Sequence, residues 1–439
     1  MAYFFITEDN KIFAGGYNSN GNTGTNTKST SSTYKYSLFP PQEIIYETLD
    51  GTILDGSMIK TINCGNGGTL LLTTNGEVYV TGSQSITGLG KGTGDKLIFT
   101  KLEYDENENK IPKIDKVFIG SSSAFLLTSN GVVYSCGMYN GVSESTKYKY
   151  NIIEFDIEGN PLLPIVDISI NNNFIAFLTN TGEVYSFGAS SSYGIYDDDN
   201  FTSHAIYYPK KARVKNVAKV VATQYSTLCL DRFGELWCNG YTFRCAYTPF
   251  VGKYYDSNKY IPYTNFMKLD ISELHMRYSD STTKYAFPKK ILDIYSISNV
   301  PIIKYLDEEG KINLLTTSGA QKYLGCGTTP NTNTYWYNVK NLAGFCDFEN
   351  TFIDRLYILD DNGIGCMSKD GNLYVAGDKG TVGGIADKFT APVVLPGTEE
   401  LTITRVFGYN GESIQPTLKD ELYPMPDISK AKVRIQNMM

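Results

Sequence analysis

The chain has 439 residues, of which 41% are hydrophobic and 19% are charged, and its formal net charge at pH 7 is −7. This acidic balance argues against general binding to nucleic acid, because such binding draws on Lys and Arg that neutralise phosphates. No apolar run reaches the roughly 18 residues of a membrane-spanning helix, and the start MAYFFITEDN lacks the basic and apolar regions of a signal peptide. We therefore expect no nucleic-acid partner, no membrane insertion and no signal peptide.

One pattern recurs along the whole chain: an apolar run, a two-residue turn, and a second apolar run that stops at Gly. It starts at Phe4 in FFITEDNKIFAGG and is clearest from Thr69 in TLLLTTNGEVYVTG. Asn-Gly accepts the positive φ angles of a type I′ turn, and the flanking Leu, Val and Tyr favour strands, so each copy predicts a β-hairpin. The residues that close the seven turns are Asn10, Gly76, Gly131, Gly182, Gly234, Gly310 and Gly371. Their spacing of roughly 50 residues or more predicts a four-stranded blade repeated around a propeller.

Further strands of the unit can be placed around these hairpins. Short β-branched runs precede four of them and predict inner strands, which end at Gly65, Gly120, Ile170 and Ala222. Glycine-rich stretches follow the hairpins and predict tight bends; they start at Gly15, Gly82, Gly188 and Gly377.

The order V-x-x-G, apolar strand, T-x-D/N-G, apolar-Tyr strand, Gly, N-x-x-G-x-x-G resembles the repeat of the regulator of chromosome condensation family. The resemblance is best in FFITEDNKIFAGGYNSNGNTG. It implies an all-β, seven-bladed β-propeller over residues 1–411, with an insertion at 241–290 and a degenerate sixth blade at about 290–345. Residues 412–439 would form a C-terminal extension or docking tail.

The first hairpin has no inner strand before it, whereas the segment ITRVFGYNG has no hairpin after it. We expect this C-terminal strand, through Ile403 and Val406, to pair with the first hairpin strand, which contains Phe4 and Ile6. Such pairing would close the ring and remove an exposed sheet edge.

The eight cysteines include no C-x-x-C pair, and the chain has only two histidines, His204 and His275, so we expect no metal site. If Phe233-Gly234 is a two-residue turn, Cys229 and Cys238 face each other, and a cross-strand disulfide becomes geometrically feasible. The absence of an export signal favours thiols instead.

Motifs for catalysis are absent from the sequence. It contains no P-loop, no G-x-S-x-G and no H-E-x-x-H, so we expect no enzyme activity and no cofactor. The acidic run Asp197-Asp198-Asp199-Asn200 lacks the alternation, central Gly and distal Glu of a calcium loop, and we interpret it as a solvated loop.

Tyrosine is abundant, with 34 residues, and is concentrated in the predicted insertion. Tyr offers apolar area and a hydroxyl at low entropic cost, as interfaces and sugar-binding platforms require. The interface candidates are Tyr247, Phe250, Tyr254, Tyr255, Tyr260, Tyr263 and Phe266. They would bind a protein or a glycan; the alternative is a lid that packs on its own propeller.

Members of the family that the chain resembles act as guanine-nucleotide exchange factors, chromatin binders, regulatory heads of larger enzymes or inhibitors. We expect a non-enzymatic protein-binding or structural module of a multi-subunit complex. The many Asn, Lys, Ile and Tyr residues are typical of an AT-rich genome and favour a bacteriophage virion, as a tail or tail-fibre-associated protein with a role in host-surface binding; otherwise we expect a cytoplasmic location. The alternative is a regulatory propeller, an exchange factor or an enzyme inhibitor, acting on a soluble protein.

Overall fold

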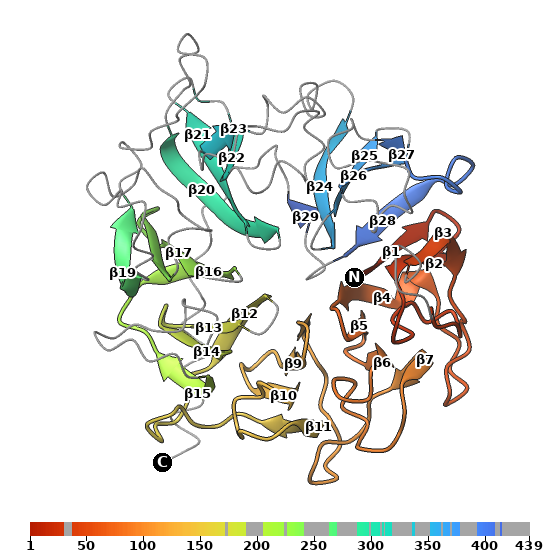
Figure 1. Ribbon diagram of the computed structural model, residues 1–439, viewed down its shortest axis with the longest axis horizontal. Helices are drawn as coiled ribbons and strands as arrows, with labels where there is room; N and C mark the ends of the chain where they lie inside the picture. The colour runs from red at the N-terminus through yellow and green to blue at the C-terminus, as the bar shows by residue number, and fades with distance from the viewer. Residues whose placement is uncertain are drawn as a thin grey trace.

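The computed structural model describes residues 1–29, 37–171, 174–189, 205–223, 226–240, 263–269, 288–297, 300–307, 310, 312–317, 336–338, 352–360, 363–368, 371–377, 393–408 and 413–414. Within these residues the strands form seven antiparallel sheets, six of four strands and one of five. The sheets follow one another around a ring (Figure 1). This architecture is the all-β propeller that the sequence predicts.

The first sheet has the order β28-β1-β2-β3, and consists of β28 (Ile403–Phe407), β1 (Ala2–Thr7), β2 (Ile12–Tyr17) and β3 (Ser37–Glu43). A 3-10 helix (Gly56–Met58) precedes the second sheet of β4 (Ile59–Cys64), β5 (Gly68–Thr73), β6 (Val78–Gly82) and β7 (Lys96–Lys101). The third sheet comprises β8 (Lys116–Ile119), β9 (Ser123–Leu127), β10 (Val133–Gly137) and β11 (Lys147–Ile152). The fourth comprises β12 (Ile165–Asn171), β13 (Phe174–Thr179), β14 (Val184–Gly188) and β15 (Ile206–Lys211).

The fifth sheet comprises β16 (Val217–Ala222), β17 (Ser226–Asp231), β18 (Leu236–Gly240) and β19 (Tyr263–Leu269). The sixth comprises β20 (Pro288–Ile297), β21 (Val300–Asp307), β22 (Ile312–Thr317) and β23 (Trp336–Asn338). The seventh has the order β27-β26-β25-β24-β29, with β24 (Phe352–Asp360), β25 (Gly363–Ser368), β26 (Leu373–Gly377), β27 (Val393–Val394) and β29 (Ser413–Ile414). The range 241–290 that the sequence assigns to an insertion thus includes the outer strand of the fifth sheet.

The hydrophobic core lies between the sheets, and each of its larger clusters joins two consecutive sheets. Along β5, Leu71 packs toward the first sheet, whereas Leu70 and Leu72 pack toward the third. Side chains of a strand alternate between its two faces. A blade that is covered on both faces therefore needs the unbroken apolar runs found in the sequence.

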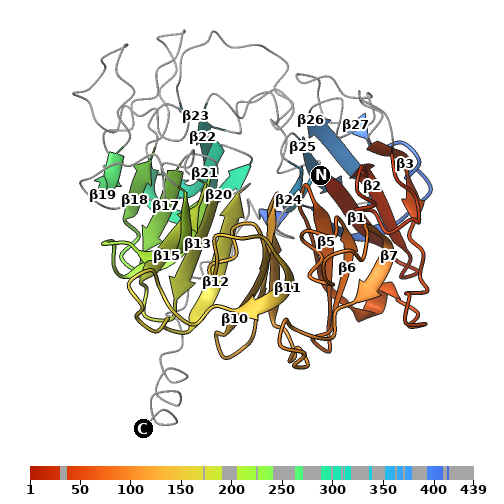
Figure 2. The ribbon, with the colours of Figure 1, turned by 60° about the horizontal axis from the view of Figure 1, so that its bottom comes forward.

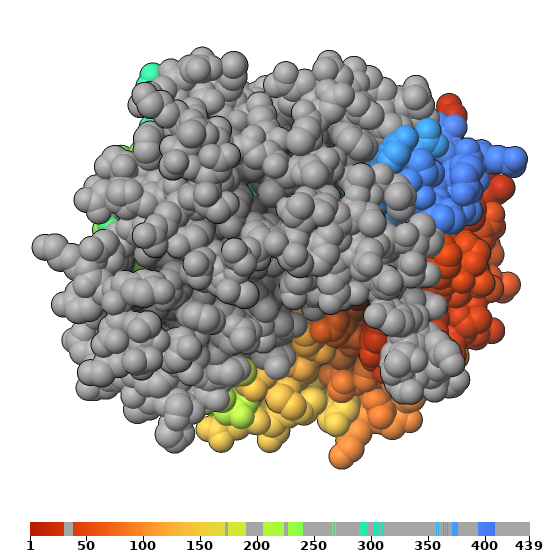
Figure 3. Space-filling view, turned by 45° about the horizontal axis from the view of Figure 1, so that its top comes forward, coloured from red at the N-terminus to blue at the C-terminus, as the bar shows by residue number. Residues whose placement is uncertain are grey.

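The C-terminal strand β28 lies beside the first strand of the chain. Val406 is opposite Phe5, Ile403 is opposite Thr7, and Phe4 is opposite Phe407 in the antiparallel register, and the Thr404 hydroxyl donates to Ile6 O at 3.1 Å. In Figure 3 the blue surface near the C-terminal end of the described chain lies next to the red surface of its first part. Strand β28 thus supplies the inner strand of the first sheet.

The hairpin turns differ from the two-residue type I′ turns expected from the sequence. In the second sheet, Thr73 N–H donates to Glu77 O at 2.9 Å and Gly76 N–H donates to Thr73 O at 3.0 Å, so the loop has one more residue. Gly76 alone in this loop has a positive φ, of 87°, as in a type I turn followed by a left-handed Gly. The Thr73 hydroxyl accepts from Glu77 N–H at 3.0 Å, which stabilises the longer loop.

This extra loop residue shifts the register by one and rules out the cross-strand disulfide. Cys229 lies opposite Trp237, and Cys238 lies opposite Leu228. Their side chains therefore point to opposite faces: Cys229 packs toward the fourth sheet and Cys238 toward the sixth. Both remain thiols.

Three charged side chains are buried between the fifth and sixth sheets. Lys219 Nζ lies 3.1 Å from Asp293 Oδ1, and Lys304 stands opposite Asp293 in the register of β20 and β21. Lys304 is 6% exposed. Burial lowers its pKa below the ordinary 10.5; Asp293 partly opposes this shift and Lys219 adds to it. This cluster therefore buries two cations around one carboxylate.

Lys304→Met should stabilise the protein by about 1 kcal/mol at pH 7, because it removes a buried cation and keeps the Lys219–Asp293 pair. The pKa of Lys304 is lower in the folded protein than in the unfolded chain. The cost in stability is therefore complete at pH values below the folded pKa, and it decreases as the pH rises toward the ordinary value of 10.5. The advantage of the variant should therefore shrink as the pH rises toward 10.5. Urea unfolding measures it, with exposed Lys110→Met as control. A variant less stable at pH 7, or a pH-independent difference, would contradict the expectation.

Candidate functional site

Most of the interface candidates taken from the sequence, Tyr247, Phe250, Tyr254, Tyr255 and Tyr260, lie outside the described residues. Tyr263 starts β19, where its backbone pairs with Gly240. Phe266 is half-buried and packs on the cluster between the fourth and fifth sheets. In the described part of the chain, Phe266 thus contributes to the packing between the fourth and fifth sheets.

A different feature recurs on the first three sheets. After the outer strand of each sheet, the chain forms a short hairpin before it reaches the next inner strand. The bridging pairs are Glu47 with Ile53, Tyr104 with Lys110, and Phe155 with Pro161. We call these segments, residues 45–54, 103–111 and 154–162, the rim hairpins.

In all three rim hairpins a side-chain oxygen at the start of the turn accepts hydrogen bonds from backbone N–H groups of the turn. Asp105 Oδ1 accepts hydrogen bonds from the N–H groups of Asn107 at 2.8 Å and Asn109 at 2.9 Å. Asp156 does the same for Glu158 and Asn160, and the Thr48 hydroxyl accepts from Thr52 N–H at 3.0 Å. Asp105 and Asp156 are buried, so these two carboxylates serve the turn and not a ligand.

Each rim hairpin ends its turn with a residue of positive φ: 81° at Gly51, 59° at Glu108 and 81° at Gly159. The second and third rim hairpins are also anchored on the next sheet. Glu106 N–H donates to Tyr150 O of β11 at 2.9 Å, and Ile157 N–H donates to Pro209 O of β15 at 2.8 Å. These bonds hold the second and third rim hairpins in place and cover part of a neighbouring sheet edge.

The rim hairpins lie on the same face of the ring as the hairpin turns between the second and third strands. In a four-stranded meander these two kinds of connection emerge at the same end of the strands. Hydrogen bonds join them directly: Ile114 N–H donates to Gly76 O at 2.9 Å, and Ile165 N–H donates to Gly131 O at 3.1 Å. In Figure 2 this face, which we call the hairpin face, lies along the lower side of the first three sheets.

Exposed apolar side chains gather on the rim hairpins. They hold six of the nine large apolar side chains that are exposed in the described residues: Ile45, Leu49, Ile53, Tyr104, Phe155 and Ile157. Exposure reaches 62% for Leu49 and 51% for Phe155. Anchoring a hairpin backbone on the next sheet does not require these exposed side chains, so they are available for contact with another molecule.

The same hairpins are strongly acidic. They contain nine carboxylates and one lysine, so their formal charge is −8, against −7 for the whole chain. Glu106 pairs with Lys147 of β11 at 3.3 Å, and Glu108 pairs with Lys149. Five other exposed carboxylates form no ion pair with Lys or Arg in the described residues; they are Glu47, Asp50, Glu103, Glu154 and Glu158.

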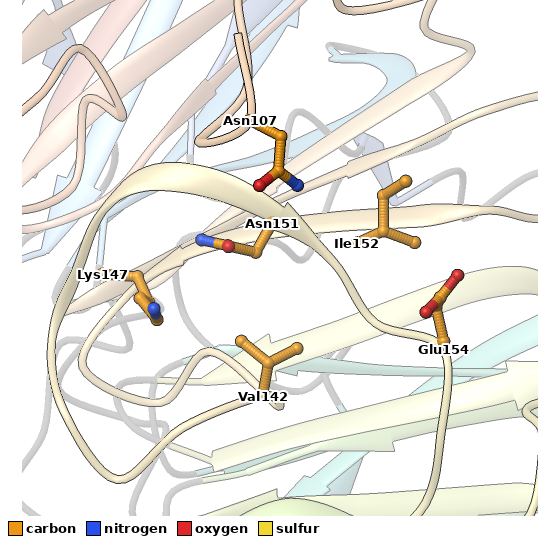
Figure 4. A pocket seen from close by; sticks show the side chains of 6 residues that line it. All are labelled: Asn107, Val142, Lys147, Asn151, Ile152 and Glu154. Atoms are coloured by element: carbon orange, nitrogen blue, oxygen red, sulfur yellow. The ribbon is translucent and has the colours of Figure 1, made fainter. Parts of the chain in front are cut away.

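An open depression of about 310 Å³ lies between the second and third rim hairpins. Its lining residues are Asn107, Val142, Lys147, Asn151, Ile152 and Glu154 (Figure 4). Asn107 comes from the second rim hairpin and Glu154 from the third, while three others line it from β11. The depression therefore combines amide, carboxylate, ammonium and aliphatic groups on the outer side of the third sheet.

The sequence does carry a signal for the rim hairpins. ETLDGTI, YDENENK and FDIEGNP start at Glu47, Tyr104 and Phe155 and follow the propeller period. Their polar composition makes them look like ordinary solvated loops, which is why the apolar runs alone did not single them out.

Two further properties follow from the described residues. They contain no helix long and apolar enough to cross a membrane. They also hold no group of three His, Cys, Asp or Glu side chains placed to bind a metal ion.

The sheets, their order and the repeated hairpins define this protein as a β-propeller. Residues 165–195 match the Regulator of chromosome condensation (RCC1) repeat. The chain is 29% identical to the human E3 ubiquitin-protein ligase HERC2 over 147 residues, which is 31% of this chain and 3% of that protein. It is 26% identical to the mouse Regulator of chromosome condensation over 129 residues, 27% of this chain and 28% of that protein.

Solved structures show the same fold. Human WBSCR16 has a TM-score of 0.61 at 17% identity, over 88% of this chain and 93% of that chain. Yeast RCC1 (Prp20), solved with Kap60, has a TM-score of 0.59 at 14% identity, over 99% of this chain and 93% of that chain. The fold of the chain is therefore that of an RCC1-like β-propeller. It matches less than a third of the length of the curated relatives given above.

Proposed function

We propose that this propeller is a protein-binding module and that its rim hairpins form the contact surface. The observation that carries the proposal is the gathering of exposed apolar side chains, such as Leu49, Tyr104 and Phe155, on anchored hairpins of one face. Aromatic side chains such as Tyr are enriched among the few residues that supply most of the energy in protein interfaces. The crystal structure of yeast Prp20p is described together with its binding to Gsp1p and histones, which supports a protein partner for a propeller of this type.

In this proposal the propeller acts by binding and not by catalysis, as is usual for RCC1-like propellers. The setting that we favour is a multi-subunit complex, and its specific case is a bacteriophage tail or tail fibre, with a virion location. The support is the abundance of Asn, Lys, Ile and Tyr in the sequence. The tyrosine-rich segment from Tyr247 to Tyr260 would be a second contact in that setting, with a protein or a host-surface glycan.

The second candidate is a regulatory propeller, an exchange factor or an inhibitor, that acts on a soluble cytoplasmic protein. The fold likeness to yeast Prp20, solved in complex with Kap60, favours this alternative. Both candidates use a protein partner, so the test of the contact surface applies to either.

The triple variant Tyr104→Ser, Phe155→Ser and Ile157→Ser should weaken partner binding at least tenfold, since one central aromatic contact is worth about 2 kcal/mol. Its melting temperature should stay within about 2 °C of wild type, because all three side chains are exposed. Partner capture from the native source, quantified by mass spectrometry, provides the measurement. The control is Met138→Ser, which removes an exposed apolar side chain from the loop after β10, at the opposite end of the strands. Equal capture by the triple variant and the wild type would refute the proposed surface.

A further inference from the structure

The chemistry of the rim hairpins also limits what kind of partner segment can bind, an inference that rests on the proposed function. The depression of about 310 Å³ is lined by Asn107 of the second rim hairpin and by Glu154 of the third. A cavity near 300 Å³ is large enough for side chains of a bound segment. The charge and the lining residues of the depression determine which side chains of a partner can bind there.

Charge selects against an acidic partner. Glu154 lines the depression, and Glu103 and Glu158 are exposed on the same two rim hairpins; none of the three forms an ion pair with Lys or Arg of the described residues. An incoming carboxylate or phosphate would be repelled by these groups, and the ammonium in the lining, that of Lys147, is already paired with Glu106. A cationic side chain would instead gain attraction and faster association.

The chain already shows that this surface accepts cations. Lys147 of β11 reaches Glu106 at 3.3 Å, and Lys149 reaches Glu108. Asn151 Nδ2 donates to the other oxygen of Glu106 at 2.7 Å. The carboxylates Glu106 and Glu108 of the second rim hairpin are therefore already paired with β11. Glu154 and Glu158 of the third rim hairpin remain available to pair with cations of a partner.

The apolar neighbours favour arginine within the cationic class. Ile152, Phe155 and Ile157 are all exposed and lie within a few residues of Glu154 and Glu158 in the sequence. An arginine can lay its aliphatic stem on such side chains, stack its guanidinium on an aromatic ring and pair with a carboxylate through two hydrogen bonds. A lysine offers only the stem and a point charge.

We therefore propose that the partner presents an arginine-rich segment with interspersed apolar residues, and that this segment docks across the depression between the second and third rim hairpins. The arginines pair with Glu154 and Glu158, and the apolar residues cover Phe155 and Ile157. The backbone anchors of both hairpins keep the site formed before the partner arrives.

A twelve-residue peptide of alternating Arg and Leu is the probe, with Lys–Leu and Glu–Leu peptides of the same length for comparison. Fluorescence anisotropy on the full chain should show binding in the order Arg–Leu, Lys–Leu, Glu–Leu, with at least tenfold between the first and last. Raising the salt from 50 to 500 mM should weaken Arg–Leu binding severalfold.

The double variant Glu154→Gln and Glu158→Gln should weaken Arg–Leu binding at least tenfold. The matched control, Glu399→Gln and Glu400→Gln, neutralises two exposed carboxylates between β27 and β28 and should bind like wild type. Equal loss in both double variants, equal binding of the Glu–Leu peptide, or no Arg–Leu binding at all would overturn the inference. If the triple Ser variant still loses the native partner while Arg–Leu fails to bind, the partner chemistry is wrong and the protein-binding surface stands.

Discussion

The double variant Ile403→Ala and Val406→Ala should lose about 5 kcal/mol of unfolding free energy. Both side chains of β28 are almost fully buried, at 2% and 5% exposure, in the cluster that joins the first sheet to the seventh. Truncating a buried Ile or Val removes transfer energy and leaves a cavity, at a cost of about 2 to 4 kcal/mol per site. Urea unfolding followed by circular dichroism measures the loss.

The control for β28 is Glu400→Ala, an exposed change just before the strand, which should shift stability by less than about 0.5 kcal/mol. Deleting residues 401–411 should go further and leave the edge of β1 open, so that the protein oligomerises on size-exclusion chromatography. A deletion variant that stays monomeric with an unchanged melting curve would refute the role assigned to β28.

Gly137→Ala is the second change with a large expected cost, of about 4 kcal/mol. Gly137 ends β10 with a φ of 99°, and an added Cβ would lie 2.1 Å from Ser122 O and 2.7 Å from Ser123 Cα. Both contacts are with backbone, and Met138 N–H donates to Ser122 O at 2.9 Å, so the neighbouring chain cannot move away without losing that bond. The cost combines the left-handed conformation with a steric clash.

Gly159→Ala is a matched control for that variant. Gly159 has a φ of 81° in the third rim hairpin, but an added Cβ would meet nothing within 4 Å. Only the conformational cost of about 1 kcal/mol remains. Thermal and urea unfolding of the two variants separate the conformational cost from the cost of the steric clash. Equal losses of unfolding free energy would mean that the close approach at Gly137 does not affect stability.

The sequence predicted the propeller fold because its unit repeats a strong signal. The inner strands expected before the hairpins are β4, β8, β12 and β16, and apolar runs such as Leu70-Leu71-Leu72 fit strands buried on both faces. Because the unit repeats at a regular spacing, repeats that match the pattern clearly indicate where the repeats with a poorer match lie.

The turn geometry could not be derived from Asn75-Gly76 alone. Asn-Gly fits a type I′ turn, but the Thr73 hydroxyl bonds to the backbone of Glu77 and stabilises a loop one residue longer. That single residue decided the register, and with it the separation of Cys229 from Cys238. Side-chain hydrogen bonds at turns compete with backbone preferences, and the Asn-Gly dipeptide alone does not show which of the two determines the turn type.

The candidate site was less predictable than the fold. Aromatic density drew attention to residues from Tyr247 to Phe266, whereas the surface found on the described chain uses scattered residues such as Leu49 and Phe155. The exposure of Phe155 depends on how the third rim hairpin is held, for example by the bond of Ile157 to the next sheet, and such a tertiary feature has no local signature. Sequence periodicity finds buried faces, and it does not distinguish an exposed contact residue from an ordinary loop residue.

Hydrogen–deuterium exchange of the propeller, free and bound to its native partner, tests the central claim most directly. Amides of the rim hairpins, residues 45–54, 103–111 and 154–162, should become more protected in the complex, together with the adjacent turns at Gly76 and Gly131. Protection confined to the loops at the opposite end of the strands, such as the loop between β10 and β11, with unchanged rim hairpins, would contradict the claim that the hairpin face binds the partner.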